Sequence, residues 1–173
     1  HPPIKPPFGD EGAANHMRLC EGHGAEGVQA FVYGANPTGR FPARQSEEAS
    51  RAVARACGVK NALFVQQSDA AIEAGAFHND VVAVANERVL FTHELALADA
   101  AAFYDRLRAA FPALQLVEVP ANAVSLADAI GSYLFNSQLV TLPDGSNALI
   151  CPLECAENAA VQAWLEGHVG GNR

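Results

Sequence analysis

The sequence predicts an α/β protein with mixed sheets, built from repeated strand–hairpin–helix units. Short runs of β-branched and aromatic residues recur along the chain, and two of them are interrupted by tight hairpin sequences. Longer segments with apolar residues at i, i+3, i+4 and i+7 follow these runs and indicate helices. Half of the 173 residues are hydrophobic and 17% are charged, so a sizeable core is available.

The first predicted elements are a strand, a helix, a second strand and a short helical turn. Residues 28–33 are β-branched and aromatic, and a Gly-Ala-Asn-Pro sequence ends this strand. Ser46 is the expected N-cap of the helix, two glutamates follow it in the first turn, and Gly58 ends the helix. Residues 62–66 form the second strand, and 70–73 form the helical turn.

The next predicted unit contains a hairpin. Strands at 81–85 and 88–92 flank the dipeptide Asn86-Glu87, which is short enough for a tight turn. A helix at 97–111 follows, with one apolar face and a proline directly after it. A strand at 114–119 closes the unit.

A second unit with a similar order is predicted in the last third of the chain. Strands at 132–141 and 147–151 surround Asp144-Gly145, a strong hairpin signal. A helix at 156–166 follows, and Gly167 is its expected terminator. This recurrence of similar elements within the chain indicates repeated α/β modules.

Composition and charge exclude several classes of function. Nineteen acidic residues stand against eleven lysines and arginines, which gives a formal charge of −8. No basic stripe occurs, so no nucleic-acid partner is expected. No stretch approaches the ~20 consecutive apolar residues of a membrane helix, so no membrane partner is expected. An anionic ligand would need a local arginine to hold it against this negative field.

The opening residues and the cysteines indicate the context of the chain. Residues 1–7 include two proline pairs, no initiator methionine and no secretory signal, which is typical of a segment from within a longer polypeptide. The four cysteines are few and irregularly spaced for a disulfide scaffold, so a reducing cytoplasm is expected.

The first candidate site is the segment 75–80, which reads GAFHND and precedes an apolar run. In an extended segment, residues two apart face the same side, so His78 and Asp80 are expected to share a pocket. An imidazole moves protons near neutral pH, and a carboxylate holds a cation beside it. The alternative is a histidine and an aspartate that only complete the hydrogen bonds of a strand end.

Two further candidates carry opposite charges. Asp10 and Glu11 are adjacent carboxylates between glycines, where small side chains allow a ligand to approach the backbone; the alternative is a solvated turn or helix start. Arg44 precedes the cap of the Ser46 helix, where a guanidinium and free amide groups suit a carboxylate; the alternative is a surface arginine on a loop.

No metal or cofactor site is expected. The histidines are scattered, and Cys151 and Cys155 have no second pair to complete a zinc site. These two cysteines are better explained as small residues packed between a strand and a helix. A metal-binding interaction module is kept as an alternative that stoichiometric metal in the purified protein would support.

Five stretches span nearly the whole chain: FGDEGAANH at 8–16, FPARQ at 41–45, GAFHNDVVAV at 75–84, SYLFNSQL at 132–139 and PLEC at 152–155. In this order they resemble the N-succinylarginine dihydrolases, members of the pentein superfamily of guanidine-modifying enzymes. The resemblance implies a hydrolase of arginine catabolism that acts on the C–N bonds of linear amidines. It also implies a cytoplasmic homodimer with a small-molecule substrate and without a cofactor.

The resemblance assigns roles only at matching positions. Glu11 and His78 match the family's catalytic residues, and Arg44 and Asp80 match substrate-binding residues. The family's nucleophile is a cysteine in a Gly-rich segment, which is expected beyond Arg173. The chain, 1–173, is therefore expected to be a single partial catalytic domain, with internal modules of a five-module α/β propeller, and to be inactive alone. The alternatives are a guanidine hydrolase similar to arginine deiminase and a non-catalytic binding fragment.

Overall fold

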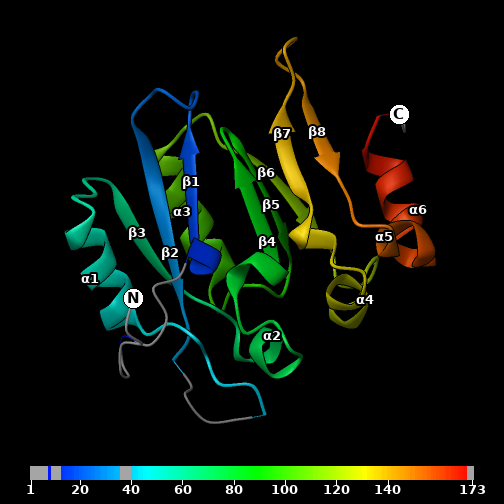
Figure 1. Ribbon diagram of the computed structural model, residues 1–173, viewed down its shortest axis with the longest axis horizontal. Coiled ribbons are helices and arrows are strands. Elements are labelled where there is room, and N and C mark those ends of the chain that lie inside the picture. The colour runs from blue at the N-terminus through cyan, green and yellow to red at the C-terminus, as the bar shows by residue number, and fades with distance from the viewer. Residues whose placement is uncertain (1–7, 9–12, 36–39, 171–173) are drawn as a thin grey trace.

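The computed structural model, which describes residues 8, 13–35 and 40–170, contains two mixed three-stranded sheets and a separate hairpin (Figure 1). In each sheet the first two strands are antiparallel and the third is parallel to the second. The α/β class with mixed sheets is therefore confirmed. The strands are β1 (His16–Cys20), β2 (Gly27–Tyr33), β3 (Ala62–Gln66), β4 (Ala83–Asn86), β5 (Val89–His93), β6 (Gln115–Val119), β7 (Gln138–Thr141) and β8 (Asn147–Ile150).

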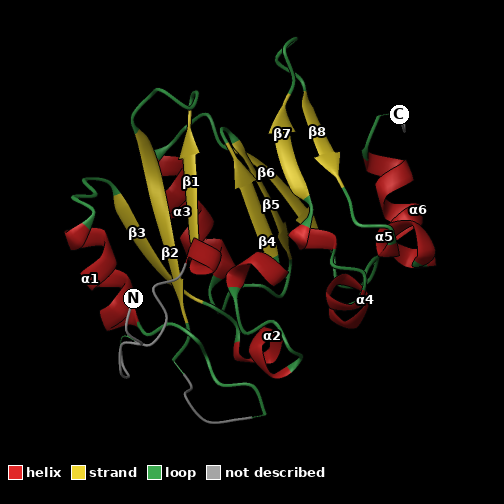
Figure 2. Ribbon diagram, in the orientation of Figure 1, coloured by secondary structure: helices red, strands yellow, loops and turns green. Residues whose placement is uncertain are grey.

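Short helices connect the strands and cover the sheets (Figure 2). Five of the α-helices begin at a serine, aspartate or asparagine whose side chain accepts a backbone N–H, as at Ser46, where Oγ accepts from Ala49 at 3.1 Å. Within the described residues, no helix has both the length and the apolar character needed to cross a membrane. The helices are α1 (Glu47–Ala56), α2 (Asp69–Glu73), α3 (Ala100–Ala110), α4 (Leu126–Gly131), α5 (Glu154–Glu157), α6 (Ala159–His168), and the 3-10 helices η1 (Ala13–Asn15), η2 (Asn79–Val81) and η3 (Leu134–Asn136).

The repeat expected from the sequence is present, but it begins one unit earlier. Module 1 (residues 16–66) and module 2 (83–119) each contain a hairpin, a helix and a third, parallel strand. The predicted unit at 81–119 is thus confirmed as module 2. Module 3 (138–168) has the hairpin and the helix, and no third strand follows in the described part of the chain. Module 1 was not predicted as a unit because its first strand, β1, was not predicted.

The modules follow one another across the molecule, and their first strands lie side by side (Figure 1). β1 contacts β4, and β4 contacts β7. Glu87, in the turn between β4 and β5, joins all three modules. Its carbonyl oxygen accepts the N–H of Cys20 at 2.9 Å, and its Oε2 accepts the hydroxyl of Thr141 at 2.8 Å.

Two hydrophobic clusters hold the modules together, and β5 contributes to both. Leu90 belongs to the cluster between modules 1 and 2, and Phe91 belongs to the cluster between modules 2 and 3. His93 at the end of β5 is fully buried, and its Nδ1 accepts the N–H of Leu95 at 3.1 Å. Its Nε2 therefore carries the proton and donates to the carbonyl of Val124 at 3.0 Å.

Among the predicted boundaries that were wrong, three have a clear local reason. Asn86 pairs with Val89, so the hairpin turn is Glu87-Arg88 and Glu87 takes a positive φ of 47°. The expected strand at 132–141 begins only at Gln138, because Tyr133 has a φ of 56° and the next three residues form η3, which buries its apolar side chains. The last helix is divided at Asn158, whose Oδ1 caps α6, and α6 continues through Gly167.

Candidate functional site

The predicted site residues Asp80 and His78 lie at η2, the short turn that leads into β4. The extended backbone expected here was wrong beyond His78: His78 is extended, with φ −122° and ψ 151°, but Asn79–Val81 is a 3-10 helix. Both side chains are half-buried. The two residues remain neighbours of one turn, so their positions depend on how that turn is held.

The segment that follows Glu11 is bound directly to this turn. Asn15, in η1, accepts the backbone N–H of Asn79 through Oδ1 at 3.0 Å, across 64 positions of sequence. Both asparagines are buried, and η1 contacts η2. Glu11 and its neighbour Asp10 lie outside the described residues. The geometry therefore brings the end of the FGDEGAANH segment to the centre of the HND turn.

Aromatic side chains bring the loop that carries Arg44 to the same place. Phe41 stacks on Phe77 with ring centroids 6.0 Å apart, and Phe77 meets the ring of His78 at 5.1 Å. The loop also packs tightly on the end of β2, since a Cβ at Gly34 would lie 2.1 Å from the Cβ of Ala43. Arg44 itself is exposed and lies two residues before the N-cap of α1.

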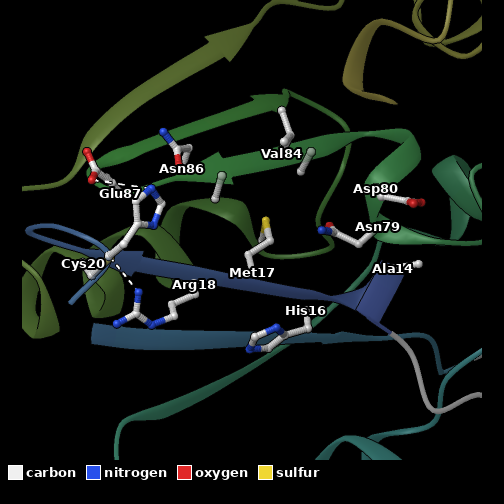
Figure 3. A pocket seen from close by; sticks show the side chains of 13 residues that line it. Ala14, His16, Met17, Arg18, Cys20, Asn79, Asp80, Val84, Asn86 and Glu87 are labelled. Atoms are coloured by element: carbon white, nitrogen blue, oxygen red, sulfur yellow. Dashed lines mark hydrogen bonds and ion pairs between the residues drawn. The ribbon is translucent and has the colours of Figure 1, made fainter. Parts of the chain in front are cut away.

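A groove of about 280 Å³ runs between β1 and β4, along the contact of modules 1 and 2 (Figure 3). Asp80, Asn79 and Ala14 line one end, and Glu87 lines the other. In Figure 3 the side chain of Met17 extends from β1 into the space between the two strands. One end of the groove thus lies beside Asp80, where η1 and η2 meet.

His16, the first residue of β1, lies beside this end of the groove. Burial lowers its pKa, and the nearby charge of Arg18 lowers it further, although the hydrogen bond to Gln29 acts in the opposite direction. Its Nε2 lies 2.8 Å from Oε1 of Gln29, so Nε2 donates the proton. Its ring also packs against Phe31 at 4.8 Å, which fixes its orientation.

Cys155 does not have the environment of an activated nucleophile. Cys20 and Cys155 are buried, and burial raises the pKa of the Cys155 thiol to about 11. This thiol donates a hydrogen bond to the carbonyl of Ser132 at 3.3 Å, as a neutral S–H does. Cys155 is therefore a packed residue of the cluster between modules 2 and 3.

Alkylation of the folded chain at about pH 8 is expected to modify exposed Cys57 and to spare Cys155. With a pKa near 11, only about one Cys155 thiol in a thousand is ionised at this pH, and the thiolate is the reactive form. Mass spectrometry after iodoacetamide treatment would measure this, with a urea-unfolded sample in which all four cysteines react. Equal labelling of Cys155 and Cys57 in the folded chain would contradict the assignment.

Three buried amides of this region were not singled out from the sequence: Asn15, Gln67 and Asn79. Amides show no periodicity or motif of their own, so only their burial and contacts reveal them. In the part of the chain that the structure describes, no group of three or more histidines, cysteines or carboxylates could hold a metal ion.

Comparison with known proteins identifies the family of the chain. The sequence model of the succinylarginine dihydrolase family matches residues 1–173. An N-succinylarginine dihydrolase of Sphingopyxis alaskensis is 62% identical over 174 residues, and one of Novosphingobium aromaticivorans is 57% identical. One of Burkholderia thailandensis is 52% identical over 183 residues. The alignments cover 98–99% of this chain and 41–42% of the relatives. The chain belongs to the succinylarginine dihydrolase family.

Proposed function

We propose that the full-length protein carrying this chain hydrolyses N2-succinylarginine. With two waters, the products are N2-succinylornithine, two ammonia and carbon dioxide. The supporting observation is the hydrogen bond from the Asn79 N–H to Asn15 Oδ1, which ties the segment following Glu11 to the turn that contains Asp80. The names of the relatives support the choice of substrate.

Glu11 and Asp80 are proposed to hold the guanidinium group. This group is a planar, resonance-stabilised cation that water attacks slowly. Carboxylates accept its N–H groups in pairs, which neutralises its charge and fixes the plane through which the carbon is attacked. Asp80 lines the groove at the junction of η1 and η2, so it is suited to this contact.

His78 is proposed as the proton carrier of two similar steps. A cysteine thiolate adds to the guanidinium carbon, and the C–N bond to ammonia breaks as His78 donates a proton. His78 then takes a proton from water, which attacks the amidino-thioether and releases the cysteine. A second cycle on the ureido product releases ammonia and carbon dioxide. The cysteine is expected outside this chain, so the chain alone is proposed to be inactive.

Arg44 is proposed to bind a carboxylate of the succinyl-arginine skeleton. The chain has a formal charge of −8, so a substrate with carboxylates is repelled at long range. A guanidinium two residues before the N-cap of α1 offsets this repulsion locally, and the positive end of the helix dipole acts in the same direction.

The reaction is tested by counting ammonia released per N2-succinylornithine formed by the full-length protein. The proposal expects a ratio of two. A ratio of one would indicate a single-step hydrolase similar to arginine deiminase, and would refute the dihydrolase assignment. The isolated chain, 1–173, should form no product; turnover by it would mean that one of its own cysteines is the nucleophile.

We also propose that the modules are consecutive blades of a five-module propeller in a cytoplasmic homodimer. The side-by-side contacts of β1, β4 and β7 and the repeated module topology support this arrangement. All four cysteines are unpaired, which agrees with a reducing compartment. Light scattering of the full-length protein would measure the oligomeric state.

The isolated chain is expected to self-associate and to melt below the full-length protein. In the described residues, no parallel third strand pairs with β8 as β3 and β6 pair with β2 and β5, and unpaired strand edges associate readily. Ile150 is 59% exposed and Leu153 is 72% exposed next to this edge. Light scattering across a concentration series and thermal melts would test this. A monomer that melts sharply at the temperature of the full-length protein would contradict it.

A further inference from the structure

Two buried amide side chains near module 1 hold the backbone on both sides of His78. Asn15 Oδ1 accepts the N–H of Asn79, the residue that follows His78, at 3.0 Å. Gln67, directly after β3, donates through Nε2 to the carbonyl of Ala76 at 2.6 Å and reaches the carbonyl of His78 at 3.4 Å. Hydrogen bonds to a backbone N–H and to backbone carbonyls therefore hold the turn before β4.

The burial of these amides makes the contacts strong and specific. Asn15 and Gln67 are each 2% exposed, and Asn79 is 1% exposed. A hydrogen bond shielded from water is electrostatically stronger, and a buried amide that loses its partner is costly. Among the residues that the structure describes, Asn15 Nδ2 and Asn79 Oδ1 have no hydrogen-bond partner. These asparagines are thus retained at some cost to stability, which is typical of functional regions.

We infer that Asn15 and Gln67 are positioning residues for the reaction proposed above, on which this inference rests. Neither residue lines the groove, and both fix the peptide units around His78. Because Asp80 follows Asn79 in the same 3-10 turn, a shift of this backbone would move the imidazole and the carboxylate together. Misplacement by about 1 Å lowers turnover by roughly 100-fold.

The opposite hydrogen-bonding roles of the two amides provide the test in the full-length protein. Asn15→Leu and Gln67→Leu should each lower kcat for succinylarginine roughly 100-fold. Asn15→Asp keeps an acceptor for the Asn79 N–H, so the kcat of this variant should lie within about tenfold of the wild-type value. Gln67→Glu replaces the donor with an oxygen that repels the Ala76 carbonyl, so it should be as impaired as Gln67→Leu.

The matched control is Asn158→Leu. Asn158 Oδ1 also accepts backbone N–H groups, from Ala160 and Val161 at 3.1 Å, but it caps α6 in module 3. This variant should lose stability and keep the wild-type kcat. Circular dichroism and thermal melts of every variant would separate lost folding from lost positioning.

The outcomes separate the inference from the proposed function. Wild-type protein that releases no ammonia from succinylarginine would refute the function itself. Active wild-type protein together with Leu variants that keep kcat within about threefold of it, like Asn158→Leu, would overturn the positioning role. Equal kcat values for Asn15→Asp and Gln67→Glu would also overturn it, because a general penalty for a buried carboxylate would then explain both.

Discussion

Replacement of His78 by asparagine in the full-length protein is expected to lower kcat for ammonia release by roughly 10²–10⁴-fold. Asparagine keeps a polar side chain of similar size but cannot donate and recover a proton near neutral pH. The loss should appear in kcat more than in KM, because the proposed binding contacts come from Glu11, Asp80 and Arg44. Steady-state ammonia release at several substrate concentrations would measure both constants.

His168→Asn is the matched control for this prediction. His168 is at the end of α6, where Nδ1 lies 2.7 Å from the carbonyl of Trp164 and its ring stacks on the indole at 4.3 Å. The same substitution there should leave kcat unchanged. A His78→Asn enzyme with at least a tenth of the wild-type kcat would rule out proton transfer by His78.

The fold could be predicted where local pattern and tertiary packing agree. The α1 helix has a serine cap and an acidic first turn, and β5 begins with the apolar residues Val89, Leu90 and Phe91, so both were recognised. The residues from Ser132 to Ser137 are as rich in apolar side chains as a strand, but Leu134 and Phe135 are buried in a 3-10 turn instead of a ladder. Packing against modules 2 and 3 decides that segment, and no local pattern contains this information.

The first strand, β1, is a strand that the sequence pattern did not predict. β1 alternates between half-buried and buried residues, starting with His16 and Met17, yet its five residues include none of the β-branched or aromatic side chains that are typical of strands. Its pairing with β2 and its contact with β4 determine the structure. Because β1 was not expected, the repeat was predicted to begin one module later than it does.

The candidate site could be predicted in its chemistry but not in its assembly. His78, Asp80 and Arg44 were selected as residue types that transfer protons or bind charged groups. Their convergence depends on contacts between distant segments, such as Asn15 with Asn79 and Phe41 with Phe77. Such pairs have no sequence spacing that identifies them, so the groove and its amide contacts emerge only from the three-dimensional structure.

Replacement of Phe91 by alanine is expected to destabilise the chain by about 3–5 kcal/mol. Phe91 is 4% exposed, and its ring lies 4.7 Å from that of Phe135 and 5.7 Å from that of Trp164. The cavity left by alanine would open between β5 and module 3, so α6 should loosen first. At roughly 2–4 °C per kcal/mol for a chain of this size, the melting temperature should fall by about 10 °C.

Trp164 provides a specific fluorescence probe for this prediction, because it is the single tryptophan of the sequence and packs directly on Phe91. Its fluorescence should shift to the red in the folded variant and should report the urea transition. Val117 pairs with Phe91 in register on β6 but is 37% exposed, so Val117→Ala should cost less than about 1 kcal/mol and leave the emission unchanged. If both variants lost the same stability, the ring cluster would not be what attaches module 3 to the second sheet.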